Sequence, residues 1–453
     1  MKSAIACILF AIVCTYVTFN REQMQKEIIY QYDKTGYYNY LPAYFIHRDL
    51  QHFAFLPHYA HMYNFGGQGF YGMHEMPDGK RVNKYPVGVS LFELPTFLIA
   101  HAYCKKSTVH GPDGYSDPYE YGIIFATILW SFLGLLVLRK FLLRHFSDTV
   151  TMIVLLCVGF GTNFYTYTAF DQGMSHTFSL FLFSALLLYT DKWHANPRPI
   201  SIYMIGLVMG AIFITRPVNI IAGIVPLAWG IENWNGIGER LKLFISKARD
   251  VLIAVVLFVA VAGIQLYYWK FATGHWLFFS YKGEEFNFME PQIINGLFSF
   301  RKGWFVYTPI ALIGMTGLFY TPKKYVPCLV AFFAIMIYVV FSWENWYYGG
   351  GFGARPLIET MAVVALPLGF LTKKLLSKKS VFVKSSYLFA LLLLISLNMF
   401  QSFQYRENII HWDRMTFAYY WRVFGTIKPK DEDQKLLISD QKYYSEIYHW
   451  NTK

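Results

Sequence analysis

Long runs of apolar residues, separated by mostly short polar segments, recur along the whole chain. Their lengths are close to the roughly 20 residues that a helix needs to cross a bilayer. We therefore predict an all-α fold, a polytopic transmembrane helical bundle of about 11 spans. The predicted spans cover residues 3–19, 121–138, 150–167, 174–189, 200–214, 218–232, 251–268, 304–320, 325–341, 357–371 and 386–400.

The composition agrees with a membrane protein. Hydrophobic residues make up 55% and charged residues 15% of the chain, a combination that is rare in soluble domains of this length. The net charge of +12 lies mostly in the short loops, where it sets membrane orientation, so we expect no nucleic-acid partner. The five cysteines are scattered, mostly in or beside apolar runs, and form no zinc or disulfide pattern.

The predicted organisation begins with one span and a long loop. The run at residues 3–19 has no convincing small-x-small cleavage site and is followed by Asn20 and Arg21, so we expect it to stay uncleaved. The parts are a first span (1–20), an outer loop with interfacial helices (21–119), a helical bundle (120–402) and a short outer tail (403–453).

One apolar run, at residues 87–103, is ambiguous because it contains Glu93 and Pro95. If it does not cross, and the N-terminus is cytoplasmic, nearly every compact basic cluster falls on the cytoplasmic side, as the positive-inside rule expects. We therefore predict a helix that lies on, or dips into, the outer leaflet. The clusters concerned are at residues 139–144, 192–198, 240–249, 323–324 and 373–384.

The segment YDKTGYYNYLPAYFIHRDL follows the first span. Tyr37, Tyr40, Leu41 and Tyr44 recur at helical spacing, which predicts an aromatic helix face at the membrane interface. Asp33 precedes this face and is a candidate general base for an incoming hydroxyl. The alternative is that Asp33 caps the helix or is only solvated.

Two further polar positions lie at predicted outer ends of spans. Asp171, in TAFDQGMSH, and His176 would face an outer cavity, although Asp171 is also a typical helix cap. Arg216, in ITRPVN, is suited to binding a phosphate or to reaching lipid headgroups. The adjacent Pro217 favours a break between helices, where membrane sites are often built.

Two later outer loops carry candidate ligand-binding residues. Glu284, in YKGEEFNFMEP, is suited to a metal or to substrate hydroxyls, unless it is simply solvated. The loop WENWYYGGGFGARP holds Glu344 and Arg355 among aromatics and glycines, which suit ligand contact or an interfacial turn. His58 and His61 could share a helix face, but no third ligand follows, and we assign no metal-binding residues.

The order of these segments resembles the GT-C superfamily of membrane glycosyltransferases, and more closely its bacterial protein O-mannosyltransferase and aminoarabinose-transferase branch. The resemblance rests on Asp33, the Tyr37-Tyr38 pair, Leu41-Pro42 and the KYPVG segment that begins at Lys84. It continues through DQGMSHTFS, TRPVN, YKGEEF and WYYGGGFGARP.

This resemblance implies a sugar donor carried on polyprenyl phosphate and an inverting transfer on the non-cytoplasmic face. It implies Asp33 as the base, Asp171 as a second acidic position, and Lys84, Arg216 and Arg355 as phosphate ligands. His176, Glu284 and Glu344 complete the expected substrate-binding set. The implied location is the bacterial inner membrane, multi-pass, with a periplasmic active face. The acceptor (glycan, lipid or protein) and any divalent metal or other cofactor stay open.

Two other functions compete with the enzyme. A transporter or flippase for a lipid-linked or polar solute would place ionisable residues near the middle of the bilayer. Here the middle of most spans has no charge and the candidates lie at outer ends, which favours the enzyme. A non-catalytic partner of another membrane enzyme would not need Asp33, Lys84 and Arg216 at one cavity.

Overall fold

The computed structural model describes residues 1–20, 29–30, 32–65, 70–281 and 283–443. In these residues the fold is helical apart from one short antiparallel hairpin, which pairs Met73 with Asn83 and Glu75 with Arg81. The first elements are α1 (Lys2–Phe19), α2 (Tyr32–Tyr38), α3 (Tyr40–Phe45), α4 (Leu56–Met62), β1 (Met73–Glu75), β2 (Arg81–Asn83), α5 (Gly88–Cys104), α6 (Asp117–Leu142), α7 (Asp148–Phe160), α8 (Phe164–Ala169), α9 (Ser175–Ala195) and α10 (Pro199–Thr215). They are followed by η1 (Pro217–Gly223), α11 (Ile224–Ala228), α12 (Trp234–Ser246), α13 (Ala248–Thr273), α14 (Ile293–Phe298), α15 (Trp304–Tyr307), α16 (Pro309–Thr316), η2 (Gly317–Tyr320), α17 (Val326–Phe341), η3 (Arg355–Leu357), α18 (Met361–Leu376), α19 (Val381–Arg406), α20 (Phe417–Val423) and η4 (Asp431–Leu436).

Four helices, α1, α6, α13 and α19, are long and apolar enough to cross a membrane. The predicted all-α class is thus confirmed, and the apolar helices agree with a membrane protein. Shorter apolar helices add to the bundle, including α7, α10 and α17. The number of spans, about 11 by the sequence pattern, stays a prediction.

Several predicted spans are not continuous helices. The span expected at 150–167 divides into α7 and α8, and that at 218–232 into η1 and α11. The span at 304–320 divides before Pro309. Proline disfavours helical geometry in the residue before it, and Thr308, with φ of −137°, has left that geometry. Arg216, with φ of −152°, precedes Pro217 in the same way and separates α10 from η1.

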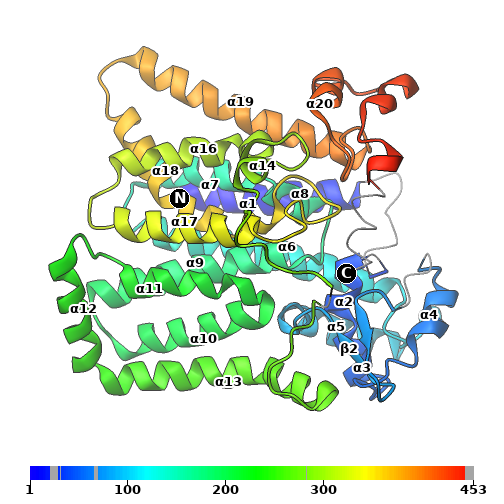
Figure 1. Cartoon of the computed structure of the whole chain (residues 1–453). Helices are drawn as coiled ribbons and strands as arrows, with labels where there is room; N and C mark the ends of the chain where they lie inside the picture. The colour runs from blue at the N-terminus through cyan, green and yellow to red at the C-terminus, as the bar shows by residue number, and fades with distance from the viewer. Residues whose placement is uncertain (21–28, 31, 66–69, 282, 444–453) are drawn as a thin grey trace.

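The elements separate towards two ends of the bundle (Figure 1). The long helices lie side by side, and α2–α5, the hairpin and α20 gather at one end, on the right. The connections α9–α10 and α18–α19, and helix α12, lie at the other end. These connections carry basic clusters, so the polar loops and the basic turns are segregated in space.

Helix contacts in the bundle depend on small residues. The backbone of α10 approaches α13 so closely that a Cβ added at Gly206 would lie 2.1 Å from the carbonyl oxygen of Ala254. Small residues at such positions let membrane helices gain dispersion contacts, which matter because lipid provides little hydrophobic driving force. The pair α10–α13 therefore forms one of the closely packed contacts of the bundle.

The predicted aromatic interface helix differs from the observed one. The segment forms two short helices, α2 and α3, and Tyr37, Tyr40 and Leu41 are buried inside the protein. Only Tyr44 of the predicted face is exposed. The reason is tertiary packing: α5 packs against both short helices, and the Tyr40 ring packs edge-on against Tyr268 of α13, with centroids 4.9 Å apart.

Candidate functional site

Asp33 lies in the first turn of α2 and is held by two side chains. Its Oδ1 accepts a hydrogen bond of 2.7 Å from the Tyr85 hydroxyl, and its Oδ2 lies 2.8 Å from the guanidinium of Arg355. Its side chain is 19% exposed. Asp33 is therefore neither a free solvated carboxylate nor the residue that precedes the helix.

The surroundings of Asp33 fix its charge. Burial alone would raise the pKa of Asp33, but the positive charge of Arg355, the Tyr85 hydrogen bond and Lys84 outweigh it, so this pKa lies below its ordinary value. Burial, followed by the nearby Asp33 charge, raises the pKa of Tyr85, which keeps its hydroxyl protonated as a donor. The resting carboxylate is therefore ionised and charge-paired.

Asp171 lies between α8 and α9 and forms an ion pair with Lys34. It does not cap α9, because the residue before that helix is Met174. Since Lys34 follows Asp33 directly, this ion pair brings Asp171 to the same site. Lys34 was not among the predicted residues; its signal was its position next to the candidate base.

Arg216 and His176 meet a buried carboxylate, Glu359. Arg216 lies 3.1 Å from one Glu359 oxygen, to which Asn219 also donates at 2.8 Å. The His176 Nδ1 accepts from Arg216 at 2.6 Å, because a guanidinium only donates. Arg216 is thus turned into the protein, with 12% of its side chain exposed, and does not reach out to lipid headgroups.

Glu359 was missed by the sequence analysis. It is fully buried and lies just before α18, inside the run predicted as the span 357–371. A single carboxylate in an otherwise apolar run is expensive to bury unless it is paired. That isolation was the available signal, and the donors that satisfy the carboxylate are Arg216, directly after α10, and Asn219 of η1.

Lys84 and Glu284 form a further ion pair, and the Lys84 amine lies 4.7 Å from the centre of the Tyr281 ring. Tyr85, the next residue, packs against Tyr37 and Tyr281 with ring centroids 4.9 and 6.5 Å away. The rings of Tyr37, Tyr85 and Tyr281 therefore form an aromatic cluster beside Asp33. Aromatic rings of this kind can pack against the apolar faces of a sugar ring.

The four cations of the site share one property. Lys34, Lys84, Arg216 and Arg355 are each paired with a carboxylate: Asp171, Glu284, Glu359 and Asp33, respectively. The Tyr37 hydroxyl donates to Ser175 at 3.2 Å and links α2 to the start of α9, beside His176. The cluster therefore joins the first outer loop to the bundle.

The glycine-rich loop positions Arg355 through its backbone. Gly353 has φ of +59°, which glycine adopts without strain, and a Cβ there would lie 2.9 Å from Cβ of Tyr307. The Phe352 N–H donates to the Tyr167 hydroxyl at 2.9 Å. Arg355 itself donates to the carbonyl oxygen of Tyr348 at 2.8 Å. The loop thus fixes the guanidinium that pairs with Asp33.

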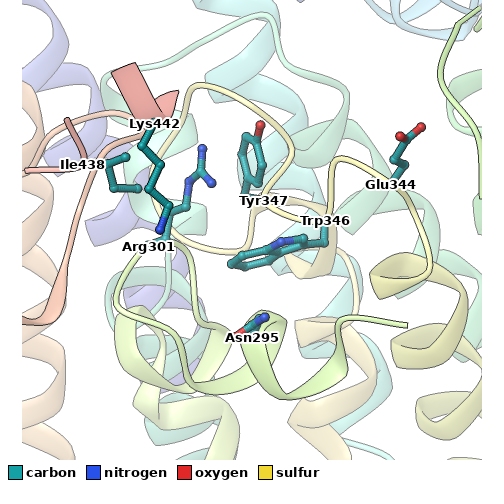
Figure 2. Close-up of a pocket in the computed structure, with 7 residues that line it drawn as sticks. All are labelled: Asn295, Arg301, Glu344, Trp346, Tyr347, Ile438 and Lys442. Atoms are coloured by element: carbon teal, nitrogen blue, oxygen red, sulfur yellow. The ribbon is translucent and has the colours of Figure 1, made fainter. Parts of the chain in front are cut away.

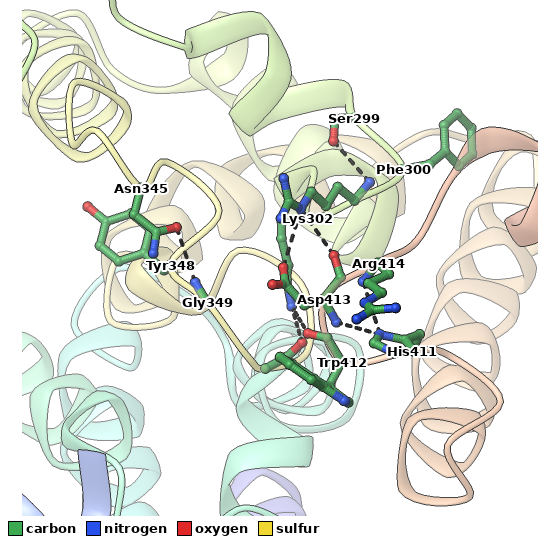
Figure 3. Close-up of polar contacts among 12 residues, drawn as sticks. Ser299, Phe300, Lys302, Asn345, Tyr348, Gly349, His411, Trp412, Asp413 and Arg414 are labelled. Atoms are coloured by element: carbon green, nitrogen blue, oxygen red, sulfur yellow. Dashed lines mark hydrogen bonds and ion pairs between the residues drawn. The ribbon is translucent and has the colours of Figure 1, made fainter. Parts of the chain in front are cut away.

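Lys302 also holds this glycine-rich loop in place (Figure 3). Its amine donates to the carbonyl oxygens of Gly351 and Trp412, and so ties the loop to the C-terminal segment. Burial lowers the pKa of Lys302 to about 7, with Asp413 opposing that shift. Lys302 was not selected from the sequence, because its carbonyl partners lie far away in the chain.

Glu344 does not belong to the Asp33 cluster. It lines a separate open cleft of about 380 Å³, and its side chain points away from Arg301 (Figure 2). The Arg301 guanidinium lies 3.4 Å from the centre of the Tyr347 ring, and that ring meets Trp346 edge-on at 5.7 Å. The lining residues are Asn295, Arg301, Glu344, Trp346, Tyr347, Ile438 and Lys442.

The described part of the chain contains no cluster of side chains typical of a metal site. No group of three or more His, Cys, Asp or Glu side chains is placed to hold an ion there. The divalent metal that the sequence left open therefore has no candidate ligand set among these residues.

Comparison with known proteins found no match for this chain among protein-family models, curated proteins or solved structures. The argument for function therefore depends on the site itself.

Proposed function

We propose that this chain is an integral membrane glycosyltransferase, which moves a sugar from a polyprenyl-phosphate donor to an acceptor on the non-cytoplasmic face with inversion. The observation that carries the proposal is the Asp33 carboxylate, ionised and held by Tyr85 and Arg355 beside three more cations. A base next to cations is what displacement of a phosphate-linked sugar requires.

In the proposed reaction, an acceptor hydroxyl oxygen attacks the anomeric carbon while Asp33 takes the hydroxyl proton. The bond between that carbon and the phosphate oxygen breaks, and polyprenyl phosphate leaves with the electron pair. Because this is one displacement, the anomeric configuration inverts. Arg355, Lys84, Arg216 and Lys34 are the cations available to the leaving phosphate.

The pairing of Arg355 with Asp33 gives the donor a further role. While the pair is intact, the lowered pKa of Asp33 makes it a weak base. A donor phosphate that draws the guanidinium away removes the largest stabilising charge from Asp33, and the buried carboxylate then binds a proton more readily. Donor binding in this proposal therefore prepares the base.

The test uses synthetic polyprenyl-phosphate sugars that carry a labelled hexose, pentose or aminosugar, with envelope extract as the acceptor source. We expect the native protein to release polyprenyl phosphate from at least one donor. The variant Asp33→Asn should be slower by about 10²-fold or more, because it lacks the base. Asp78→Asn, at an exposed turn on the same outer segment, serves as the matched control. Consumption of no donor, or full activity in Asp33→Asn, would overturn the proposal.

The cleft around Trp346 is the proposed acceptor site. It lies on the loop that continues to Arg355, and its perpendicular aromatic rings with nearby charged groups suit a hydroxyl-rich ligand. Trp346→Ala should raise the KM for the acceptor about tenfold and leave the KM for the donor within about twofold. Equal changes in both constants would place the acceptor elsewhere. Trp276→Ala, an exposed tryptophan on another loop, is the control.

A further inference from the structure

Helix α12 crosses the end of the bundle opposite the candidate site (Figure 1). It connects α11 to α13 and runs across the direction of both α10 and α13. If α13 crosses a bilayer, as its length and apolar character allow, α12 lies roughly in the plane of the membrane surface. A helix in that position contacts protein, lipid and water on different sides.

One side of α12 is attached to the protein. The Phe244 ring stacks on Trp193, with centroids 5.4 Å apart and planes inclined by 20°. Arg240 donates to His194 and to the carbonyl oxygen of Trp229. These contacts fix the rotation of α12 about its axis, and therefore determine which residues face outwards.

A second side is apolar and uncovered. Ile237, Leu241 and Ile245 follow one another at intervals of four residues, so they form one stripe along the helix. Their exposed fractions are 46%, 59% and 66%. Leaving three large aliphatic side chains in water would be costly, which indicates that something apolar covers them.

The exposed apolar residues of α13, the next helix, indicate that lipid covers the stripe on α12. At its start, α13 exposes Leu252, Val255 and Val256, and it continues with Val259. These residues belong to a helix that is long and apolar enough to cross a membrane, so acyl chains reach this end of the bundle. The stripe on α12 lies only a few residues earlier in the chain.

The charge at this end favours anionic lipid. The exposed cations are Lys242 in α12, Lys192 in the last turn of α9, Arg198 just before α10 and Arg249 in the first turn of α13. Two neighbouring carboxylates are already engaged: Asp191 pairs with Arg144 and His145, and Asp250 accepts the Tyr203 hydroxyl at 2.9 Å. The carboxylates of Glu232 and Glu239 are also exposed, and the four cations outnumber these two acidic groups.

We propose that α12 is an interfacial anchor that binds an anionic phospholipid surface. Ile237, Leu241 and Ile245 enter the acyl region, while Lys242, Arg249, Lys192 and Arg198 contact phosphate headgroups. This surface lies at the end of the bundle away from Asp33, and the proposal does not depend on the glycosyltransferase reaction.

Insertion is tested on the full chain in lipid nanodiscs. A fluorescent probe is attached to Leu241→Cys or, as the matched control, to its neighbour Lys242→Cys, in a background whose five buried native cysteines are replaced. Brominated acyl chains in phosphatidylglycerol–phosphatidylcholine discs should quench the first probe strongly and the second weakly, because residue 242 lies at the headgroups, outside the acyl region. Equal quenching at both positions, or none at 241, would overturn the insertion of the stripe. A stripe covered by a second protein would give the latter result.

Headgroup binding is tested with spin-labelled lipids. The native protein should associate with phosphatidylglycerol in preference to phosphatidylcholine, and each cation removed should reduce that preference by up to about fivefold. The test variant combines Lys192→Gln, Lys242→Gln and Arg249→Gln. The control combines Lys105→Gln and Lys106→Gln, two exposed lysines after α5 at the other end. An unchanged preference in the test variant, or an equal loss in the control, would overturn the assignment of headgroups to α12.

Discussion

At the scale of residues, the site depends on how charge is shared between neighbours. Asp33 accepts from Tyr85 and pairs with Arg355, while the loop that carries Arg355 is held by Lys302. Tyr85 and Lys302 are buried, and Asp33 and Arg355 are only 19% and 15% exposed, so the loss of one partner would leave the other group poorly solvated. Single substitutions at these positions should therefore have large effects.

Lys302 gives a pH-dependent prediction. Burial lowers its folded pKa to about 7, from an ordinary value of 10.5, so between these pH values the unfolded chain binds more protons than the folded one. Stability therefore rises with pH across this window. Lys302→Met removes the titrating group, and we expect its unfolding temperature to rise less between pH 7 and 10 than that of the native protein, by scanning fluorimetry in detergent.

The control for that experiment is Lys428→Met, an exposed lysine of the same C-terminal segment. It should leave the slope of unfolding temperature against pH unchanged. If Lys302→Met keeps the native slope, the Lys302 amine is not the group that titrates in this window.

At the scale of elements, the helices depend on close approach where the sequence supplies small residues. Pairs such as α10 and α13 show this, because their backbones meet at Gly206 with no space for a side chain. The kinks at Arg216 and Thr308 have a different origin, because each precedes a proline. The break at Arg216 brings Arg216 and Asn219 to Glu359.

The packing of α10 on α13 predicts contrasting effects for two glycines. Gly206→Ala should destabilise the protein by about 1–3 kcal/mol, because its Cβ would overlap the Ala254 carbonyl. Gly263→Ala, in α13, meets nothing within 4 Å and should be neutral or stabilising by up to about 1 kcal/mol, since alanine favours helix. Unfolding by denaturant measures the change in the free energy of unfolding for both variants. Equal changes would mean that the close contact between Gly206 and Ala254 is not formed.

At the scale of the whole molecule, the site and the basic turns occupy opposite ends of the bundle. A glycosyltransferase with a lipid-linked donor needs this separation, because its polar site must open to one side only. A transporter would have to expose its site to both sides in turn. Membrane orientation therefore discriminates between the two functions.

Cysteine labelling measures that orientation. With the native cysteines replaced, Val109→Cys, in the first outer loop, should react with an impermeant maleimide added outside the cell, and Lys378→Cys should react only after permeabilisation. Val109 is 82% exposed and residue 378 is exposed as well, so access is not limiting. Labelling of both residues from outside, or of Lys378→Cys alone, would contradict the predicted topology. Either result would favour the transporter hypothesis over the glycosyltransferase.

The site could be predicted only in part, and the residues show why. Asp33, Asp171, Lys84, His176, Arg216, Glu284 and Arg355 were selected from the chain, and the structure brings them together in one cluster. Glu344 was selected with them but lines a different cleft. Lys34, Lys302 and Glu359 were missed: Lys34 and Glu359 had local signals that were not used, and the carbonyl partners of Lys302 lie in distant segments.

The sequence by itself determined that the chain is helical and apolar enough for a membrane, since hydrophobic run length is a local property that each segment carries alone. It also placed the basic clusters in short turns. Only the tertiary structure decided which carboxylate pairs with which cation, that α5 and α13 cover the tyrosines of α2 and α3, and where the glycine-rich loop holds Arg355. Those outcomes depend on contacts between residues far apart in the chain, whose geometry is set when the helices pack.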